Sequence, residues 1–189
     1  MRKSQKGFTL IELLIVIVII GVLAGVLIAV INPFRQQNRA RNAAIRAGAM
    51  KVAFAINTAR AGLGKLPDEV ELDSELENII PGTGCDTVAT LNCTIKVSGI
   101  IMPETCVSGG VYGHSDTAGS PCVFGIVSIG SSLVDGMFRI AAKQFKLDPA
   151  DAALIYVFDS TVGMYSCPAD TDYTSSGLDL TTVCTEVNE

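Results

Sequence analysis

Histidine and the usual metal- and nucleotide-binding motifs are almost absent from this 189-residue chain. The only histidine is His114, no two cysteines form a C-x-x-C pair, and there is no glycine-rich phosphate loop. Zinc sites and P-loops need those patterns, so the sequence argues against both. His114 lies in a Gly/Ser/Asp-rich stretch, where we expect an exposed loop residue and not part of a catalytic centre. We therefore expect no enzyme and no cofactor.

Acidic residues are scarce in the first third of the chain. Residues 1–62 carry nine Lys/Arg and the single acid Glu12, a formal +8, whereas residues 63–189 carry five basic and eighteen acidic residues, a formal −13. Such a split indicates two regions in different surroundings. An acidic C-terminal part repels phosphate, so we expect no direct binding of nucleic acid.

All six cysteines lie in the acidic part: Cys85, Cys93, Cys106, Cys122, Cys167 and Cys184. An even number confined to one segment predicts disulfides and an oxidising, extracytoplasmic location. Six cysteines allow about fifteen pairings. Proximity along the chain favours 85 with 93, 106 with 122 and 167 with 184; metal binding is the alternative reading.

The longest apolar run extends over 24 residues, from Phe8 to Ile31. As a helix it would measure ~36 Å, enough to cross a hydrocarbon core of ~30 Å. A cleaved secretory signal would have an apolar region of only ~7–15 residues, so we expect a retained anchor. Gly21 and Gly25 form a small-x-x-x-small pair, which favours close helix packing in lipid.

Glu12 lies inside this apolar run, where an acid costs a few kcal/mol and suggests a functional site. In the alternative reading, Glu12 sits at the membrane interface and reaches water. A short basic leader, residues 1–7, precedes the run and ends at the Gly7–Phe8 junction. A protease cutting there would leave Phe8 with a free α-amino group within reach of a carboxylate.

The stretch Gly7-Phe8-Thr9-Leu10-Ile11-Glu12 resembles the processing motif of type IV prepilins and pseudopilins. The resemblance implies that a prepilin peptidase cuts after Gly7 and that Phe8 is then N-methylated. It also implies that Glu12 pairs with the α-amino group of a neighbouring subunit, which would remove the burial penalty of both charges. The implied partners are other copies of the chain, other pilins, the peptidase and an inner-membrane assembly platform.

Basic residues flank both ends of the apolar run, so charge alone leaves its orientation open. The predicted disulfides require the C-terminal part to lie outside. We therefore expect a single-pass protein of the inner membrane, N-terminus in and C-terminus out. The resemblance places it later in an extracellular pilus or a periplasmic pseudopilus.

Beyond the run, Pro33 predicts a kink or a local break. Apolar residues then recur every three or four positions from Ala40 to Ala59, which predicts an amphipathic helix over residues 32–62. Gly62-Leu63-Gly64 predicts its end. One helix from Phe8 to about Ala61 resembles the long spine of pilins.

Residues 63–189 are predicted to form a β-rich head. Segments rich in Val, Ile and Phe alternate with turn residues, and five strands are expected: Thr94–Met102, Cys106–Tyr112, Cys122–Ile129, Met137–Lys143 and Ala153–Asp159. The fold class is therefore α+β, an N-terminal helix packed on an antiparallel sheet. Residues 167–184 read as a loop closed by one disulfide, which resembles the C-terminal region of many pilins. Asp170 and Asp172 are weak calcium candidates in this loop, because the glycine and distal glutamate of an EF-hand loop are missing.

The leading hypothesis is a structural subunit of a type IV pilus that polymerises through its N-terminal helix. One alternative is a pseudopilin of a type II secretion or DNA-uptake system, which would carry the same motif. A second alternative is a membrane-tethered binding module that does not polymerise.

Overall fold

The computed structural model describes residues 7–30, 32–68, 71, 92–95, 97–101, 103, 124–130 and 136–187. It divides into two compact units, Met1–Gln37 and Asn38–Glu189. The first unit contains the helix α1 (Leu10–Val30). A second helix, α2 (Pro33–Leu63), begins in the first unit and continues into the second. The predicted spine is thus two helices, with α2 beginning at the proline that was expected to interrupt it.

Helix α2 packs on the head through the predicted periodic face. Ile45, Ala49, Val52 and Ile56 are all buried, at spacings of three and four residues. The helix ends at Leu63, where Gly64 follows with a positive φ of 72° and its N–H donates to the Arg60 carbonyl at 2.9 Å. Glycine adopts this left-handed conformation without steric cost, so the predicted helix end is confirmed.

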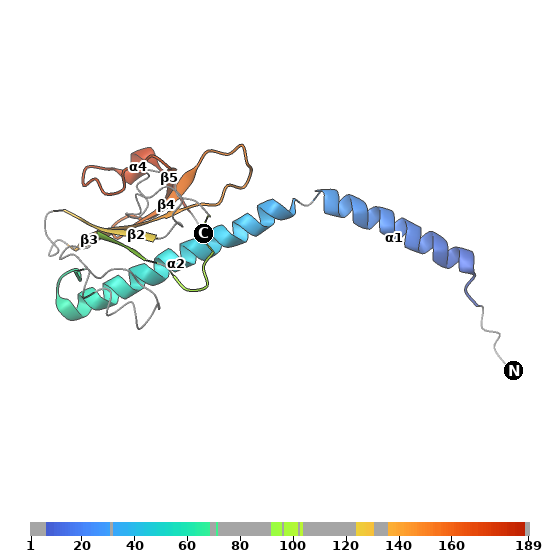
Figure 1. The fold of residues 1–189 in the computed structure, drawn as a ribbon, viewed down its shortest axis with the longest axis horizontal. Helices are drawn as coiled ribbons and strands as arrows, with labels where there is room; N and C mark the ends of the chain where they lie inside the picture. Colours follow the sequence, from blue (N-terminus) through green and yellow to red (C-terminus); the bar gives the residue numbers. More distant parts are fainter. Residues whose placement is uncertain are drawn as a thin grey trace. The chain divides into compact units, whose positions relative to one another are not determined.

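The head contains a six-stranded antiparallel sheet in which the strands follow one another in sequence order (Figure 1). Every strand pairs with its neighbour in the chain. A four-residue helix, α4 (Leu180–Val183), precedes the last strand. The strands are β1 (Asn92–Ile95), β2 (Phe124–Ile129), β3 (Met137–Lys143), β4 (Leu154–Asp159), β5 (Gly163–Pro168) and β6 (Thr185–Glu186).

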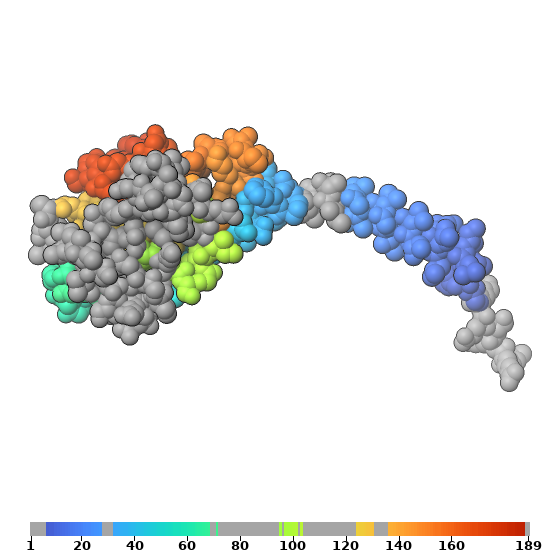
Figure 2. Space-filling view, viewed as in Figure 1, coloured from blue at the N-terminus to red at the C-terminus, as the bar shows by residue number. Residues whose placement is uncertain are grey.

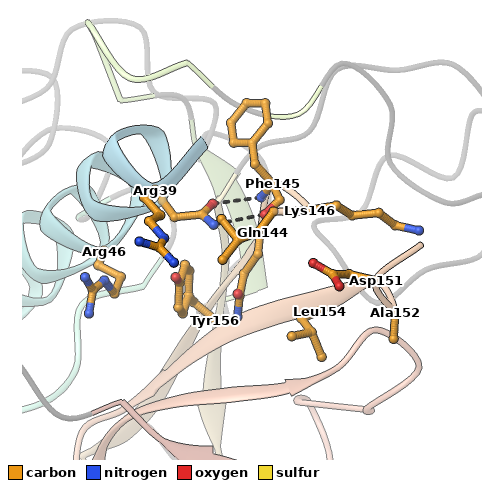
Figure 3. A pocket seen from close by; sticks show the side chains of 11 residues that line it. Arg39, Arg46, Gln144, Phe145, Lys146, Asp151, Ala152, Leu154 and Tyr156 are labelled. Atoms are coloured by element: carbon orange, nitrogen blue, oxygen red, sulfur yellow. Dashed lines mark hydrogen bonds between the residues drawn. The ribbon is translucent and has the colours of Figure 1, made fainter. Parts of the chain in front are cut away.

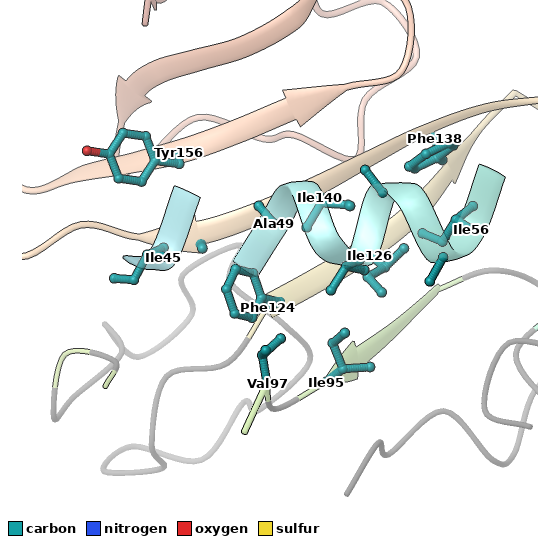
Figure 4. Close-up of a cluster of buried hydrophobic side chains, with 14 of the residues drawn as sticks. Ile45, Ala49, Ile56, Ile95, Val97, Phe124, Ile126, Phe138, Ile140 and Tyr156 are labelled. Carbon is teal, nitrogen blue, oxygen red and sulfur yellow. The ribbon is translucent and has the colours of Figure 1, made fainter. Parts of the chain in front are cut away.

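One face of the sheet packs against α2. Phe124, Ile126, Phe138 and Ile140 from β2 and β3 meet the buried face of the helix and form the larger apolar cluster (Figure 4). Successive side chains of a strand point to opposite faces, so alternate residues of β3 and β4 belong to this cluster. The expected α+β fold, with an antiparallel sheet on the helix, is therefore confirmed.

The opposite face of the sheet is covered by the chain's own C-terminal segment. Val127, Ala141 and Val157 contribute to a second apolar cluster, together with Tyr173 and Leu180 from the segment after β5. In Figure 2 this C-terminal segment, in orange to red, forms part of the outer surface of the head. Both faces of the central strands are thus buried, which explains why β2 and β3 read as near-continuous apolar runs.

Of the five strand predictions, three match closely, one is wrong in its bounds and one is not tested. The strands expected at Cys122–Ile129, Met137–Lys143 and Ala153–Asp159 correspond to β2, β3 and β4. The strand expected at Thr94–Met102 is wrong in its bounds, because β1 ends at Ile95 and a turn follows, in which Gly99 has a φ of 78°. The expected strand Cys106–Tyr112 lies outside the described residues. Strand β5 was missed.

Candidate functional site

The N-terminal motif begins α1 with a capping box. Thr9 precedes the helix, and its Oγ1 accepts a hydrogen bond from the Glu12 backbone N–H at 3.3 Å. In return, Glu12 Oε2 accepts from the Thr9 backbone N–H at 3.0 Å and from the Thr9 hydroxyl at 2.8 Å. Two orphan amides of the first turn are satisfied in this reciprocal way.

This capping gives Glu12 a local structural role that the sequence reasoning missed. The signal was present, because Thr-x-x-Glu before an apolar run is the pattern of a capping box. All three hydrogen bonds involve Oε2 or the backbone N–H of Glu12, and within the described residues Oε1 accepts none. The carboxylate is therefore held in place but keeps one oxygen for a further cation.

The predicted cleavage junction lies just outside the helix. Gly7, Phe8 and Thr9 have no regular secondary structure, and α1 begins at Leu10. The Phe8 side chain is 82% exposed. A peptide bond that a protease must bind in extended form is therefore not locked into helical hydrogen bonds here. Cleavage between Gly7 and Phe8, and methylation of Phe8, stay predictions.

Helix α1 exposes apolar side chains on all sides. Every described side chain from residue 7 to residue 27 is exposed, and Leu10–Leu27 has a mean hydropathy of 3.1. By length and composition this helix can cross a membrane. A helix apolar all round must be buried in a protein core or a membrane, and none of this one is buried within the described chain. The helix fits a membrane-anchored protein.

Gly21 and Gly25, the predicted helix-packing residues, lie in α1, and Pro33, the predicted kink, lies at the start of α2. A Cβ on Gly21 or Gly25 would meet nothing within 4 Å, so both glycines leave the α1 backbone open to another helix. Pro33 is the first residue of α2, and the Asn32 side chain accepts hydrogen bonds from the backbone N–H groups of Phe34 and Arg35 at 3.1 and 3.3 Å. Asparagine before proline at a helix start is a favourable N-terminal cap. Helix packing at the glycines and a kink at Pro33 stay predictions.

A disulfide closes the C-terminal segment. It joins Cys167, in β5, to Cys184, immediately after α4. This pair is the one predicted for the C-terminal loop, although the enclosed segment also contains α4. The predicted pairings of 85 with 93 and of 106 with 122 each involve at least one cysteine outside the described residues, and His114 also lies outside them.

A buried arginine fastens the same segment to the sheet. Arg139, in β3, donates through Nε to Asp159 Oδ2, its direct cross-strand neighbour in β4, at 2.6 Å. Its Nη1 donates to the carbonyls of Tyr173 and Ser175 at 3.2 and 2.8 Å, and its Nη2 donates to that of Leu178 at 2.9 Å. The arginine fork thus binds three backbone carbonyls of the C-terminal segment at once.

The carboxylate of this pair is kept ionised. Burial raises the pKa of Asp159, but hydrogen bonds from Thr161 and Arg139 outweigh it and place the pKa below its usual value. Sequence reasoning did not single out this ion pair, because one Arg in an apolar strand is ordinarily an exposed position.

The two calcium candidates lie in the loop between β5 and α4. Asp170 and Asp172 are both exposed, and Asp172 Oδ1 accepts hydrogen bonds from the backbone N–H and the hydroxyl of Thr174 at 3.0 and 2.6 Å. Within the described part of the chain, no three His, Cys, Asp or Glu side chains are grouped so as to hold a metal ion. Weak calcium binding at Asp170 and Asp172 stays a prediction.

Comparison with protein families gives one match. Residues 2–28 match the family described as the prokaryotic N-terminal methylation motif, which is the signature of type IV pilins and pseudopilins. The matched range contains the Gly7–Phe8 junction, the Thr9–Glu12 capping box and most of α1. Neither the curated proteins nor the solved structures compared with this chain gave a match.

Proposed function

Because the chain carries the type IV pilin and pseudopilin signature, we propose that it is a structural subunit of a type IV pilus. It is processed after Gly7 and polymerises through its N-terminal helix. The proposal rests above all on Glu12, an acid at the head of a wholly apolar and exposed helix. Ordinary membrane anchors have no need of such a charge, which is costly in hydrocarbon.

The capping box supports this role for Glu12 in a specific way. The carboxylate uses Oε2 for its own helix and presents Oε1 without a partner among the described residues. The α-amino group of Phe8 in a neighbouring copy would neutralise the charge that capping leaves in place. Opposite charges in a low dielectric attract strongly, and each removes the penalty of burying the other alone.

Separating the two roles of Glu12 tests the proposal. Glu12→Gln keeps an amide oxygen that can complete the capping box but removes the charge. Thr9→Ala keeps the charge and removes the hydroxyl of the cap. Each variant would be made in a cell that also makes wild-type subunits, and its incorporation into sheared filaments would be measured by mass spectrometry.

We expect Thr9→Ala to enter filaments at near wild-type level and Glu12→Gln to be reduced at least tenfold. Equal incorporation of Glu12→Gln and wild type would refute the assembly role of the charge. N-terminal mass spectrometry of both variants provides the control, because each must show a methylated Phe8 to be a fair test. The length of the filaments on wild-type cells then separates a pilus from a short pseudopilus.

A further inference from the structure

The head has a basic groove between α2 and the connection from β3 to β4 (Figure 3). It has a volume of about 520 Å³, and its cationic lining residues are Arg39, Arg46 and Lys146. Asp151 is the single acid among the lining residues, and its carboxylate accepts a hydrogen bond from the Asp148 backbone at 2.8 Å. The groove therefore concentrates positive charge on a head that is acidic overall.

Some polar side chains that line the groove make hydrogen bonds within the fold, whereas others make none among the described residues. Asn42 exchanges two hydrogen bonds with the Phe145 backbone, at 2.9 and 2.8 Å, and so fastens the β3–β4 connection to α2. Gln144 donates to the Ile155 carbonyl and the Ser166 hydroxyl. These side chains form the walls of the groove and are already satisfied.

The donors on the α2 side of the groove have no acceptor within the described chain. Arg46 Nε is buried without a hydrogen-bond partner, and its guanidinium lies 5.9 Å from the centre of the Tyr156 ring. Figure 3 shows Arg39 and Arg46 both extending beside that ring. Burial raises the pKa of Tyr156, so its hydroxyl stays protonated and can donate. Arg39, Arg46 and Tyr156 thus place three hydrogen-bond donors close together. Such an arrangement is suited to binding an anion.

Three cations, Arg39, Arg46 and Lys146, line the groove against one carboxylate, so the lining carries a net positive charge. An oxyanion brought to the arginines would offset this positive charge. Arginine forks match a carboxylate geometrically, and charge-assisted hydrogen bonds of this kind are among the stronger ones.

Exposed acids cluster on the opposite face of the head. Asp170, Asp172 and Asp179 are exposed in the segment that covers the far side of the sheet from α2. Hydrogen bonds from Thr181 lower the pKa of Asp179, so this carboxyl is ionised at neutral pH. The sheet separates these acids from the groove of the same chain. Only another copy can bring them to it.

We propose that the basic groove of one copy binds the acidic segment around Asp170 and Asp172 of the next copy. The inference rests on the proposed polymerisation and adds a second contact to it, between heads. The two surfaces differ, so the contact is heterologous, and a heterologous contact that does not close into a ring propagates as an open filament. Charge complementarity of this kind also fixes register and speeds encounter.

Charge reversal on both surfaces tests the proposal in full-length chains expressed in the assembling cell. Arg39→Glu/Arg46→Glu makes the groove negative, and Asp170→Lys/Asp172→Lys makes the acidic segment positive. Each double variant alone should lower the yield of sheared filaments at least tenfold, because close interfacial charge pairs couple strongly. The chain that carries all four substitutions restores attraction and should recover to within about threefold of wild type.

A matched control is Lys51→Glu, which reverses one exposed charge on the same helix outside the groove. It should leave filament yield unchanged, and its single-site counterpart Arg39→Glu should not. Failure of the four-fold variant to recover, while each double variant stays folded and methylated, would overturn the pairing. So would groove variants that change only the retention of anionic lipid by the unassembled chain, since the groove would then serve the membrane.

The control for the proposed function is Glu12→Gln in the same cells. If it abolishes incorporation while reversal of the groove has no effect, the assembly role of the helix stands and the contact between heads is wrong. If wild-type chains form no filament at all, the proposed function itself fails. Wild-type filaments should also fragment in about 1 M salt, where screening shortens electrostatic range to ~3 Å.

Discussion

Among the residues that the structure describes, Arg139 is the only buried cation, and replacing it should destabilise the head severely. Arg139→Met keeps much of the side-chain volume but leaves Asp159 buried without its partner and three loop carbonyls without a donor. Removing one partner of a buried ion pair costs about 3–5 kcal/mol. For a chain of this size, 1 kcal/mol shifts Tm by about 2–4 °C, so the expected decrease is about 6–20 °C.

Thermal unfolding of the full chain in detergent measures this change, with near-UV circular dichroism reporting on the buried tyrosines Tyr165 and Tyr173. Arg39→Met is the matched control, because Arg39 is exposed and its replacement should change stability by no more than about 0.5 kcal/mol. The double variant Arg139→Met/Asp159→Leu should be less destabilised than Arg139→Met, since no orphaned charge remains. Equal Tm shifts for Arg139→Met and Arg39→Met would refute the reasoning.

The ion pair between Arg139 and Asp159 should make the stability of the head depend on pH. The pKa of Asp159 is lowered in the folded protein, so its ionised form contributes stability above the unfolded pKa of about 3.9. That stability is lost as the pH falls further, through the folded pKa. In Arg139→Met the buried carboxylate is unpaired, and protonation relieves it. The difference in Tm between wild type and Arg139→Met should therefore shrink below about pH 4; a constant difference would contradict the ion-pair account.

Three further predictions concern the packing of the head. Gly48→Ala should lower the free energy of unfolding by about 1–3 kcal/mol, because its Cβ would collide with side chains packed on α2. Gly62→Ala has open space around it and should raise the free energy of unfolding slightly, and urea denaturation compares the two variants. Reducing the disulfide between Cys167 and Cys184, which closes a loop with a sequence separation of 17, should cost about 3 kcal/mol and raise hydrogen exchange in the enclosed segment first. Asn42→Ala should cost about 1–3 kcal/mol through the two backbone groups it leaves unpaired, and exchange of the β3–β4 connection would show it.

The apolar helix and the helix–sheet packing followed from periodicity in the sequence. Ile45, Val52 and Ile56 recur at helical spacing and all three are buried. The end of α2 followed from Gly64, because only a residue that tolerates positive φ fits that position. These features are local, and each depends on a few neighbouring residues.

The anchoring of the C-terminal segment could not be predicted in this way. Arg139 contacts residues 20 to 39 positions away in the chain, so no local pattern reveals its partners. Its strand is buried on both faces, which removes the polar alternation that would have shown which side faces the second layer. Strand β5 was missed for a related reason, since Gly163–Pro168 combines glycine, serine and proline and reads as a turn.

The energy of the capping box can be compared with the cost of placing the Glu12 charge at the start of an apolar helix. A Thr-x-x-Glu box is worth about 0.5–2 kcal/mol to a helix, and a glutamine at the same position completes it almost as well. The helix dipole favours a carboxylate over an amide at this position by only about 0.3–1 kcal/mol. The charge costs about 2.5–3.5 kcal/mol if it reaches the hydrocarbon centre, so the helix start alone does not compensate for it. The proposed function supplies a cation outside the capping box, and Oε1 is the atom of Glu12 that the capping leaves for it among the described residues. In that proposal a second copy with a processed Phe8 supplies the cation as its α-amino group, so we expect the charge of Glu12 to matter for assembly and not for the stability of the single chain.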